Sequence, residues 1–580
     1  MHRSGLVLVA AAFPLAWIAC QGPTAVRAIA YTEVPCDTQA PVAVVVASDL
    51  AELNAKLAAG IVSSTRAGCS GGLVGDLVVT PPGANDGPIA FALLTRADGQ
   101  TPDRCGDPTL GASDRSQCIV AKRALRFRSH EQVDVRVDLR GACRGIACGA
   151  EQTCVKGTCV SAQVASVCAG TCTETDLTVG DAGVAPGLCD PLPPPTGHVV
   201  EVSDVASLVA AVSGASPNDT ILIADGTYSL TGAPLLIEAE GVTLRSKSGK
   251  RDAVVLDGGY DPGAGAMPIT IHGSHVTVAS LTVQRAYYHP IHVASLNADI
   301  KGTLLYDLHV IDPAEQAIMI HGDPAFTHFA DDGVVACSKI ELTAAGRAQV
   351  RNNCFTGGVD AHAARGWTVR DNWIEGFYCS AGLAEHAVHF WRGSRDTTVE
   401  RNVIRDNVRG IGLGLGQGVA GRSYADQPCG GAANMGSYGG IVRNNAVSAQ
   451  APELFGSQSG FDTGIGLEES CEAVVVHNSV ASTQPPGSSS LEVRFAATRA
   501  TVTNNLLSAA FKVRDGAASQ AAGNVEQAPL SLFRDVPAGD LHVTIAAAPR
   551  GIALPSGLAD RDIDGDARAI ASPAVGADEP

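Results

Sequence analysis

The chain has 580 residues, of which 45% are hydrophobic, only 4% are aromatic, and 64 are glycine. This length exceeds what one core usually organises, and the composition favours short strands joined by tight turns over helical bundles. The formal net charge of −18 excludes a general affinity for nucleic acid or for anionic lipid surfaces. Residues 340–410 are different, because nine arginines there balance eight acidic residues, so a polyanion is best accommodated in this segment.

Residues 1–30 are predicted to be an export signal. His2 and Arg3 precede an apolar run from Leu6 to Ala19, which is too short to span a bilayer. Ile18-Ala19-Cys20 resembles the cleavage motif of bacterial lipoproteins, and Ala28-Ile29-Ala30 is a rival cleavage site. We therefore expect an exported protein, either an outer-membrane or cell-surface lipoprotein attached to the membrane only through a lipid on Cys20, or a secreted protein.

The cysteine content agrees with export. Of 17 cysteines, sixteen remain if Cys20 carries lipid, an even number that can pair in an oxidising compartment. The densest group, Cys143, Cys148, Cys154 and Cys159, lacks the two-residue gaps and nearby histidines of a zinc site, so disulfides are predicted there. The spacing leaves the pairing open.

Composition divides the exported chain into three regions. Residues 36–140 hold short β-rich runs separated by Gly, Pro and Asp turns, which predict a small Ig-like β-sandwich. Residues 141–195 form a disulfide-rich stretch that ends in a proline-rich linker, Asp190-Pro191-Leu192-Pro193-Pro194-Pro195, which is stiff because of its prolines. Residues 196–580 form the third region.

The third region is repetitive. One hexamer, which begins with Val and has Asn at its fourth position, recurs six times at irregular spacing. The six copies are Val350–Phe355, Val369–Ile374, Val399–Ile404, Val442–Val447, Val475–Val480 and Val502–Leu507. One such turn cannot bury its apolar face alone, so the copies are expected to stack as coils, with the asparagines forming an internal hydrogen-bonded ladder.

This pattern resembles the right-handed parallel β-helix of the pectate-lyase-like superfamily over about residues 198–580. Pro217–Tyr228 is similar to the opening coil of such domains, and Asp564–Arg568 with Val575–Glu579 is similar to their C-terminal ending. The predicted fold class is all-β: a right-handed parallel β-helix preceded by the sandwich and the disulfide-rich stretch.

The strand before each hexamer is expected to alternate inward and outward side chains. With the apolar residues inward, one outer face gathers His272, His292, His321, His362 and His389. Outward polar residues are also ordinary on a solvent-wetted sheet, so the stripe of histidines fits a plain surface as well as a ligand groove.

The resemblance implies a groove that binds a polysaccharide, with aromatic rings stacking on sugars and cations holding uronate carboxylates. The candidate catalytic residues are His362, His389, Arg392 and Glu385, and the candidate substrate-binding residues are Trp391, Arg365, Arg395, His321, Tyr378 and Glu468. Histidines on neighbouring coils are close enough for two or three imidazoles to converge on one divalent ion, and calcium is possible without a clear ligand set, since this face offers few of the oxygen ligands that calcium needs. No metal site or cofactor is assigned from the sequence.

The predicted function is an exported β-helix protein, expected to be monomeric, that binds and in one version cleaves an acidic, uronate-containing polysaccharide. β-Elimination, as in a polysaccharide lyase, would use His389 or His362 as base and Arg392 as carboxylate clamp; a glycoside hydrolase is the second enzymatic option. No lysine lies between Lys339 and Lys512, so the Lys/Arg pair of the lyase relatives has no counterpart. The alternative is a noncatalytic structural or adhesive surface protein.

Overall fold

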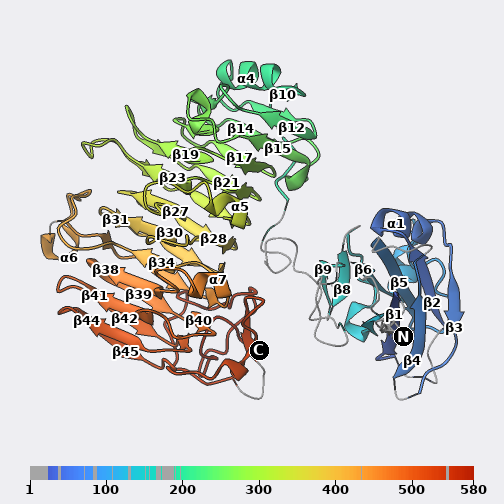
Figure 1. Cartoon of the computed structure of the whole chain (residues 1–580). Coiled ribbons are helices and arrows are strands. Elements are labelled where there is room, and N and C mark those ends of the chain that lie inside the picture. The colour runs from blue at the N-terminus through green and yellow to red at the C-terminus, as the bar shows by residue number, and fades with distance from the viewer. Residues whose placement is uncertain are drawn as a thin grey trace, which may run out of the picture. The chain divides into compact units, whose positions relative to one another are not determined.

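The computed structural model describes residues 24–580 except 35, 37–40, 71, 82–87, 108, 128–131, 150–151, 156, 163, 165–171, 173–188, 190, 196, 433 and 544–547. The chain divides into two compact units, Met1–Thr178 and Val179–Pro580 (Figure 1). Cys20 and the apolar run of the predicted export signal lie outside the described residues.

The N-terminal unit is the predicted sandwich of two small sheets. One sheet has the order β4-β1-β7 and the other β3-β2-β5-β6. Their strands are β1 (Ala25–Thr32), β2 (Val42–Ala47), β3 (Ser64–Arg66), β4 (Leu73–Val79), β5 (Pro88–Arg96), β6 (Cys118–Arg126) and β7 (Gln132–Leu139). Phe91 and Leu93 of β5 face the other sheet, whereas Ala92 and Leu94 pack beneath helix α1 (Leu50–Ala58). Both faces of β5 are therefore buried, which explains its unbroken apolar sequence.

Strand β1 corrects the predicted start of this unit. β1 pairs with β4 and β7 as the central strand of its sheet, and Val26 and Ala28 are buried. The prediction assigned residues up to 30 to the export signal and began the sandwich at residue 36. The folded unit begins no later than Ala25, because three-stranded pairing and the core both require this strand.

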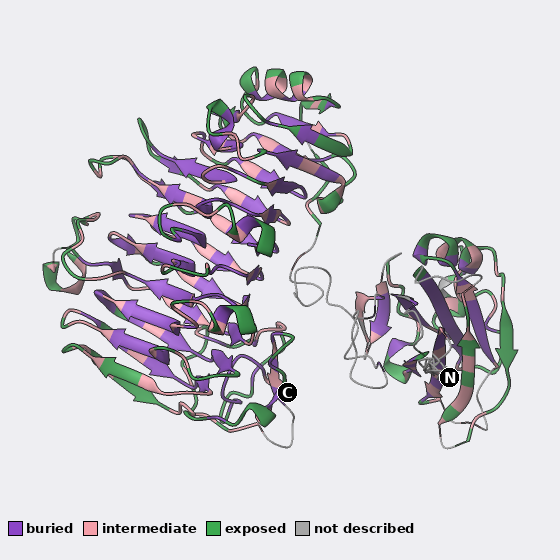
Figure 2. Cartoon of the chain, in the orientation of Figure 1, coloured by how far each residue is buried: buried purple, intermediate pink, exposed green. Residues whose placement is uncertain are grey.

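The second unit is a parallel β-helix made of three long sheets around one apolar core (Figures 1 and 2). Sheet A contains β10 (Val199–Val202), β11 (Thr220–Ile223), β14 (Thr243–Ser246), β17 (Thr277–Ala279), β21 (Leu304–Tyr306), β25 (Val334–Ala336), β28 (Thr368–Arg370), β32 (Thr398–Glu400), β36 (Ile441–Arg443), β39 (Ser470–Val476), β42 (Arg499–Thr503) and β45 (Ala518–Ala522), with β31 (Ser394–Arg395) and β35 (Ser437–Tyr438) at its margin. Sheet B contains β12 (Gly226–Ser229), β15 (Val254–Asp257), β18 (Thr282–Gln284), β22 (His309–Ile311), β26 (Lys339–Glu341), β29 (Trp373–Glu375), β33 (Val403–Arg405), β37 (Ala446–Ala449), β40 (Ser479–Ser482) and β43 (Leu506–Leu507). Sheet C contains β13 (Leu235–Ile237), β16 (Ile269–Ile271), β19 (Ile291–Ala294), β23 (Gln316–His321), β27 (Gly357–His362), β30 (His386–Trp391), β34 (Arg409–Leu413), β38 (Thr463–Glu468), β41 (Ser489–Arg494) and β44 (Phe511–Arg514).

The asparagine ladder runs through the turns between sheets A and B. Each side-chain amide donates to the Oδ1 atom of the next asparagine at 2.9–3.0 Å, in the order Asn372, Asn402, Asn445, Asn478, Asn505 and Asn524. The valines that begin these hexamers are in register from Val369 to Val502. Five of the six predicted hexamers therefore stack as expected.

The first predicted hexamer, Val350–Phe355, is not part of the ladder. It follows the short helix α5 (Ala344–Arg347), and Asn352 and Asn353 are exposed turn residues. The preceding rung is Ser338, whose backbone N–H donates to Asn372 Oδ1 at 2.9 Å. Asn524 extends the ladder at the other end without a matching hexamer, since the sequence around it lacks the leading valine.

The N-terminal end of the stack is covered by helix α4 (Val205–Ser213), which places Leu208 and Val212 on the first coils. Burying this open end removes the exposed apolar cross-section that a stack of coils would otherwise present there. The C-terminal segment with β46 (Phe533–Asp535) and β47 (Asp540–Val543) packs instead on the outer face of sheet B, where Phe533 and Leu541 share an apolar cluster with Ala446, Ala481 and Leu506.

A strap of chain crosses the outside of sheet A. Cys189 forms a disulfide with Cys337, directly after β25. Leu192 packs with Cys189 against Tyr306 and its neighbours, and Arg245 Nη1 donates to the carbonyl of Pro193 at 2.9 Å. The chain is thus fixed to the middle of the stack before it reaches β10 and begins the first coil.

Candidate functional site

Strands β23, β27, β30, β34, β38 and β41 of sheet C each carry an irregularity that decides which side chains face outward. In β30, Ala387 and Val388 both belong to the apolar core, so two successive residues point inward. The strand pairing skips Ala387, matching His386 with Arg409 and Val388 with Ile411. This irregularity, which we call the bulge, recurs in the neighbouring strands without a change of register, and it puts His386 on the same face as His389 and Trp391.

Neighbouring strands bring the outward residues together. Asp360 lies opposite His389, and His362 lies opposite Trp391. The His389 and Trp391 rings stack with centroids 5.4 Å apart and planes 7° apart, while the His386 ring lies 4.7 Å from that of His389. Because the strands are paired in register, five outward side chains form one cluster: Asp360, His362, His386, His389 and Trp391.

Asp360 is the centre of this cluster, although it is only 1% exposed. Its Oδ1 atom accepts a hydrogen bond from Trp391 Nε1 at 3.0 Å and lies 3.4 Å from His389 Nδ1, and its Oδ2 atom lies 3.2 Å from His362 Nε2. Burial alone would raise the pKa of Asp360, but His362 and His389 hold that pKa far below its ordinary value. A buried carboxylate therefore stays ionised among three rings.

Glu385, His386 and His389 form the deeper part of the cluster. The Glu385 Oε2 atom lies 3.5 Å from His389 Nδ1, and His389 Nε2 lies 3.3 Å from the Gly414 carbonyl oxygen. Burial raises the pKa of Glu385 and lowers that of His386 well below its ordinary value. Burial also opposes the charge on His389, yet Asp360 and Glu385 raise its pKa overall. The three groups thus have different protonation preferences within one small volume.

A pocket of about 290 Å³ lies at the outer edge of this cluster, lined by His321, His362, Arg392, Met319, Asp323 and Phe326 among others. The Arg392 guanidinium lies 4.7 Å above the Trp391 ring, and within the described chain it has no ion pair with an acidic residue. His321 Nε2 lies 2.7 Å from His292 Nε2. The pocket therefore combines imidazoles with an arginine that forms no ion pair with a described carboxylate, although Asp323 also lines the pocket.

The other predicted site residues occupy different surroundings. Arg395 pairs with Asp426 at 2.8 Å and with Asp396 at 3.2 Å, and Arg365 lies 3.8 Å from Asp331, which Arg422 binds through both oxygens at 2.7 and 3.0 Å. These two predicted arginines already have acidic partners, and Arg395 does not pair with Glu385.

Glu468 and Tyr378 also lie apart from the pocket. Glu468 accepts a hydrogen bond from the Gly416 N–H at 2.7 Å and pairs with Arg494 at 3.1 Å. Tyr378 is only 5% exposed, with the Arg347 guanidinium 4.1 Å above its ring. This burial does not favour the predicted role of Tyr378 as a platform for sugars.

Sequence reasoning missed His386 because strict alternation places residues 386 and 389 on opposite faces. A signal was present: a small residue followed by an aliphatic one recurs at this position in successive strands. The pairs are Ala317-Ile318, Gly358-Val359, Ala387-Val388, Gly410-Ile411, Gly464-Ile465 and Ser490-Leu491. A small residue fits the tight inward side of a bulge, so this pattern could have located it.

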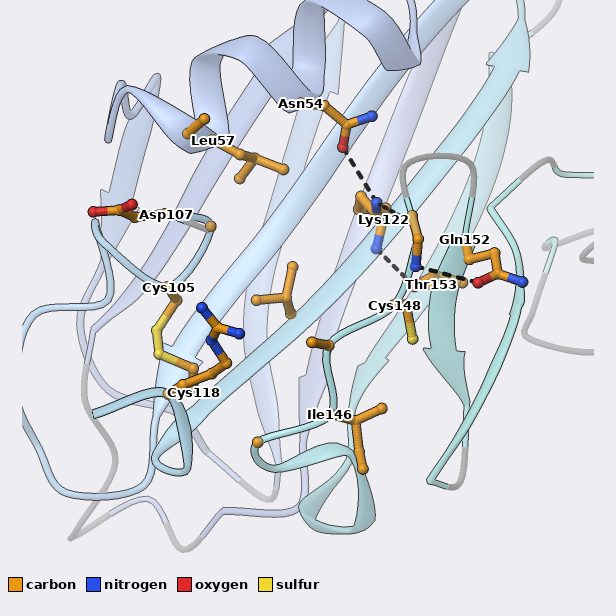
Figure 3. A pocket seen from close by; sticks show the side chains of 17 residues that line it. Asn54, Leu57, Cys105, Asp107, Cys118, Lys122, Ile146, Cys148, Gln152 and Thr153 are labelled. Atoms are coloured by element: carbon orange, nitrogen blue, oxygen red, sulfur yellow. Dashed lines mark hydrogen bonds between the residues drawn. A yellow bond between two sulfur atoms is a disulfide. The ribbon is translucent and has the colours of Figure 1, made fainter. Parts of the chain in front are cut away.

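A second hollow, of about 350 Å³, lies in the N-terminal unit beside α1 (Figure 3). One of its two basic groups, Lys122, donates to Asn54 Oδ1 at 3.2 Å and to the Gly149 carbonyl at 2.8 Å, and the other is Arg115. A disulfide joins Cys105 to Cys118 at the wall of the hollow. The lysine is held by these acceptors, so its contacts serve the packing of this unit.

No protein-family model and no curated protein sequence matches this chain. Similar solved structures include an alginate lyase from Paenibacillus sp. str. FPU-7, with 13% identity and a TM-score of 0.31 over 50% of this chain and 97% of that one. A PL6 family polysaccharide lyase from Pseudopedobacter saltans has 11% identity and a TM-score of 0.29 over 58% of this chain and 96% of that one. PfbA, a surface adhesin of Streptococcus pneumoniae, has 10% identity and a TM-score of 0.31 over 56% and 86%. These scores carry no argument about function, and the β-helix assignment rests on the strand pairing described above.

Seven disulfides join described cysteines, among them Cys143–Cys154 and Cys148–Cys159 in the stretch predicted to be disulfide-rich. Such density is typical of proteins that mature in an oxidising compartment outside the cytoplasm. Among the residues that the structure describes, no helix combines the length and apolarity needed to cross a membrane.

Proposed function

We propose that this protein is exported and binds an acidic polysaccharide at the pocket of His321, His362 and Arg392, where it cleaves the chain by β-elimination. The observation that carries the proposal is the meeting of two groups in one pocket: His362, oriented by the buried Asp360, and Arg392, which has no acidic partner among the described residues. An arginine without an ion-pair partner is suited to bind a carboxylate of a ligand.

His362 is the proposed base. Because its Nε2 atom faces Asp360 Oδ2 at 3.2 Å, the carboxylate fixes the ring orientation and leaves Nδ1 to accept a proton. His362 removes the proton on the carbon next to the uronate carboxylate. The electron pair forms a carbon–carbon double bond as the bond to the glycosidic oxygen on the following carbon breaks, and this oxygen takes up a proton from water. Arg392 stabilises the negative charge that develops on the carboxylate.

Trp391 is the proposed contact for a neighbouring sugar through the part of its side chain that stays accessible, since the residue is only partly buried and both His362 and Arg392 lie against its ring. His389 is placed differently from the earlier expectation. It is fully buried, so it is out of reach of a polysaccharide and is proposed to position Asp360 and Trp391. Hydrolysis by paired carboxylates is less well supported, because Asp360 is buried and already engaged by three side chains.

The test is to incubate the purified protein with a panel of uronate polymers and to follow the ultraviolet absorbance of the unsaturated product. His362→Ala is expected to lower turnover by about 100-fold or more with binding retained, as for loss of a general base. Arg392→Ala and Trp391→Ala are expected to weaken binding itself, measured by affinity electrophoresis. Arg499→Ala and His198→Ala change exposed residues on sheet A and at the start of the first coil and serve as matched controls.

If no polymer is bound, the proposal is wrong as a whole. If a polymer is bound through Arg392 and Trp391 without any unsaturated product, the elimination step is wrong and the noncatalytic adhesive alternative applies.

A further inference from the structure

We propose that Glu385, His386 and His389 bind a divalent transition-metal ion, for which Zn²⁺ is the appropriate probe. Their ligand-type atoms all lie within 4.8 Å of one another. The three residues come from one strand and the residue before it, and only the bulge at Ala387 and Val388 lets both histidines face the same side. This inference is independent of the proposed polysaccharide function.

The first observation behind the proposal is a set of polar atoms without partners. His386 is 5% exposed and His389 fully buried, yet Glu385 Oε2, His386 Nδ1 and His389 Nδ1 have no hydrogen-bond partner among the described residues. An unsatisfied polar atom in a protein interior costs about 1–3 kcal/mol. Three such atoms gathered in one volume indicate a group that binds all of them.

The second observation is the orientation of His389. Its Nε2 atom lies 3.3 Å from the Gly414 carbonyl oxygen, so a hydrogen on Nε2 is donated there. The lone pair of Nδ1 then faces two carboxylate oxygens, Asp360 Oδ1 at 3.4 Å and Glu385 Oε2 at 3.5 Å. Lone pairs from three groups repel one another unless a positive charge lies between them. Either a proton on Nδ1 or a metal ion supplies that charge, and the two unpartnered neighbours, Glu385 Oε2 and His386 Nδ1, favour the metal ion.

The ligand set indicates the class of metal. Two imidazoles and one carboxylate are typical of zinc and of other first-row transition metals, whereas calcium and magnesium prefer oxygen ligands. Zinc–nitrogen bonds of about 2.0–2.1 Å require each side chain to move inward by about an ångström or less. Three protein ligands leave a further coordination position for water or for an oxygen of a bound molecule.

The other ligand-type clusters in the described chain lack these features. Cys189 and Cys337, which lie near Asp371, are joined in a disulfide. His542 near Asp564 already has close carboxylate partners on both ring nitrogens, Asp540 at 2.5 Å and Asp564 at 2.7 Å. The cluster in β30 is distinguished by its unpartnered atoms.

Gly412 provides a sensitive test of the position of His386. A Cβ atom at Gly412 would lie 2.7 Å from three atoms of the His386 ring, whereas one at Gly466 would come no closer than 3.6 Å to any neighbouring atom. Neither glycine has a positive φ, so alanine suits both backbones. Gly412→Ala should therefore displace His386 and weaken metal binding by about 10-fold or more, while Gly466→Ala should not.

The experiment uses the full chain, stripped with a chelator and then titrated with Zn²⁺, with bound metal measured by mass spectrometry after dialysis. One equivalent is expected for the wild type. His386→Ala, His389→Ala and Glu385→Gln should each lose that equivalent, and His198→Ala should retain it. Co²⁺ should give the visible absorption bands of a low-symmetry site in the wild type, which tests the proposal without relying on the folding of any variant.

Two outcomes would overturn the proposal: a wild-type protein that retains no Zn²⁺ and shows no Co²⁺ bands, or metal retained equally by the His386 and His389 variants. The first would mean that a proton on His389 supplies the positive charge between the two carboxylates. Polysaccharide binding plays no part in these measurements, so the two proposals can fail separately.

Discussion

The ladder asparagines show how one residue type can specify a stack of coils. Asn445 donates to the Val399 and Arg443 carbonyls and to Asn478 Oδ1, and it accepts from the backbone N–H and side-chain amide of Asn402. Every polar atom of this buried amide has a partner in its own coil or an adjacent one. The ladder thus fixes the register of the coils as well as satisfying buried groups.

We expect Asn445→Ala to lower the free energy of unfolding of the β-helix by about 3 kcal/mol or more, because it leaves several buried hydrogen-bond donors and acceptors without a partner at once. Asn353→Gly is the matched control. Asn353 has the same sequence context but is exposed, with φ of 59°, a conformation that glycine adopts freely. Denaturant unfolding followed by circular dichroism compares the two. Equal losses in both variants would contradict the role assigned to the ladder.

The site was only partly predictable at this scale. His362, Arg392 and His321 were selected from the sequence because alternation and charge placed them on one face, and the structure gathers them in one pocket. The sequence did not reveal that Asp331 and Asp426 bind nearby arginines, since these ion pairs join residues far apart in the chain. It also gave no means of telling the buried His389 from the partly exposed His362, because burial depends on loops whose paths the pattern does not encode.

At the scale of elements, the turn from sheet A to sheet B repeats one backbone conformation. The residue before each of the five ladder asparagines that belong to a hexamer has a positive φ between 52° and 58°. These residues are Asp371, Arg401, Asn444, His477 and Asn504. Asn, Asp and His adopt this conformation more readily than most residues. The hexamer's polar third position, visible in the sequence, is thus a requirement of the turn.

His477 makes this turn sensitive to acid. Burial lowers the pKa of His477 to about 3, and the positive charge of Arg568 acts in the same direction. Between that value and about 6.5 the unfolded chain binds a proton that the folded chain does not, so this histidine costs stability as the pH falls below about 6.5. The loss amounts to about 1.4 kcal/mol for each pH unit.

His477→Asn should reduce this acid sensitivity, because asparagine occupies the same position in the adjacent coils at Asn444 and Asn504. Between about pH 7 and about pH 4.5, the variant should lose about 2–3 kcal/mol less stability than the wild type. Unfolding free energies at the two pH values test this. The contributions of the other buried histidines to the pH dependence cancel in the comparison, because both proteins contain them. Parallel pH profiles would show that His477 does not stay neutral in the folded state.

The bulge explains why the inward-facing core residues of sheet C were predictable from the sequence, whereas the full set of outward-facing site residues in β30 was not. Strand periodicity predicted the inward apolar residues of sheet C, since each run from β23 to β41 buries them in one core. A bulge shifts only the residues before it to the other face. The inward apolar residues therefore agree with the prediction, while the outward face of β30 gains His386, which the prediction had placed on the opposite face.

For the whole molecule, β1 limits where an export signal can be cleaved. Cleavage after Ala30 would remove most of a strand that is paired on both edges, whereas cleavage before Cys20 would leave it intact. We expect a chain that lacks residues 1–23 to keep the cooperative unfolding of the N-terminal unit and a chain that lacks residues 1–30 to lose it. Differential scanning calorimetry of the two truncated chains decides this, and a normal N-terminal transition without residues 1–30 would contradict the placement of β1.

The disulfide between Cys189 and Cys337 also determines how tension would travel through the molecule. A pull transmitted from the N-terminal unit reaches the β-helix first at Cys337, beside β25, and not at the first coil. The coils from β10 to β21 and their covering helix α4 are bypassed, so the load enters the interior of the stack. A protein built in this way is not unravelled from its first coil for as long as that covalent bond is intact.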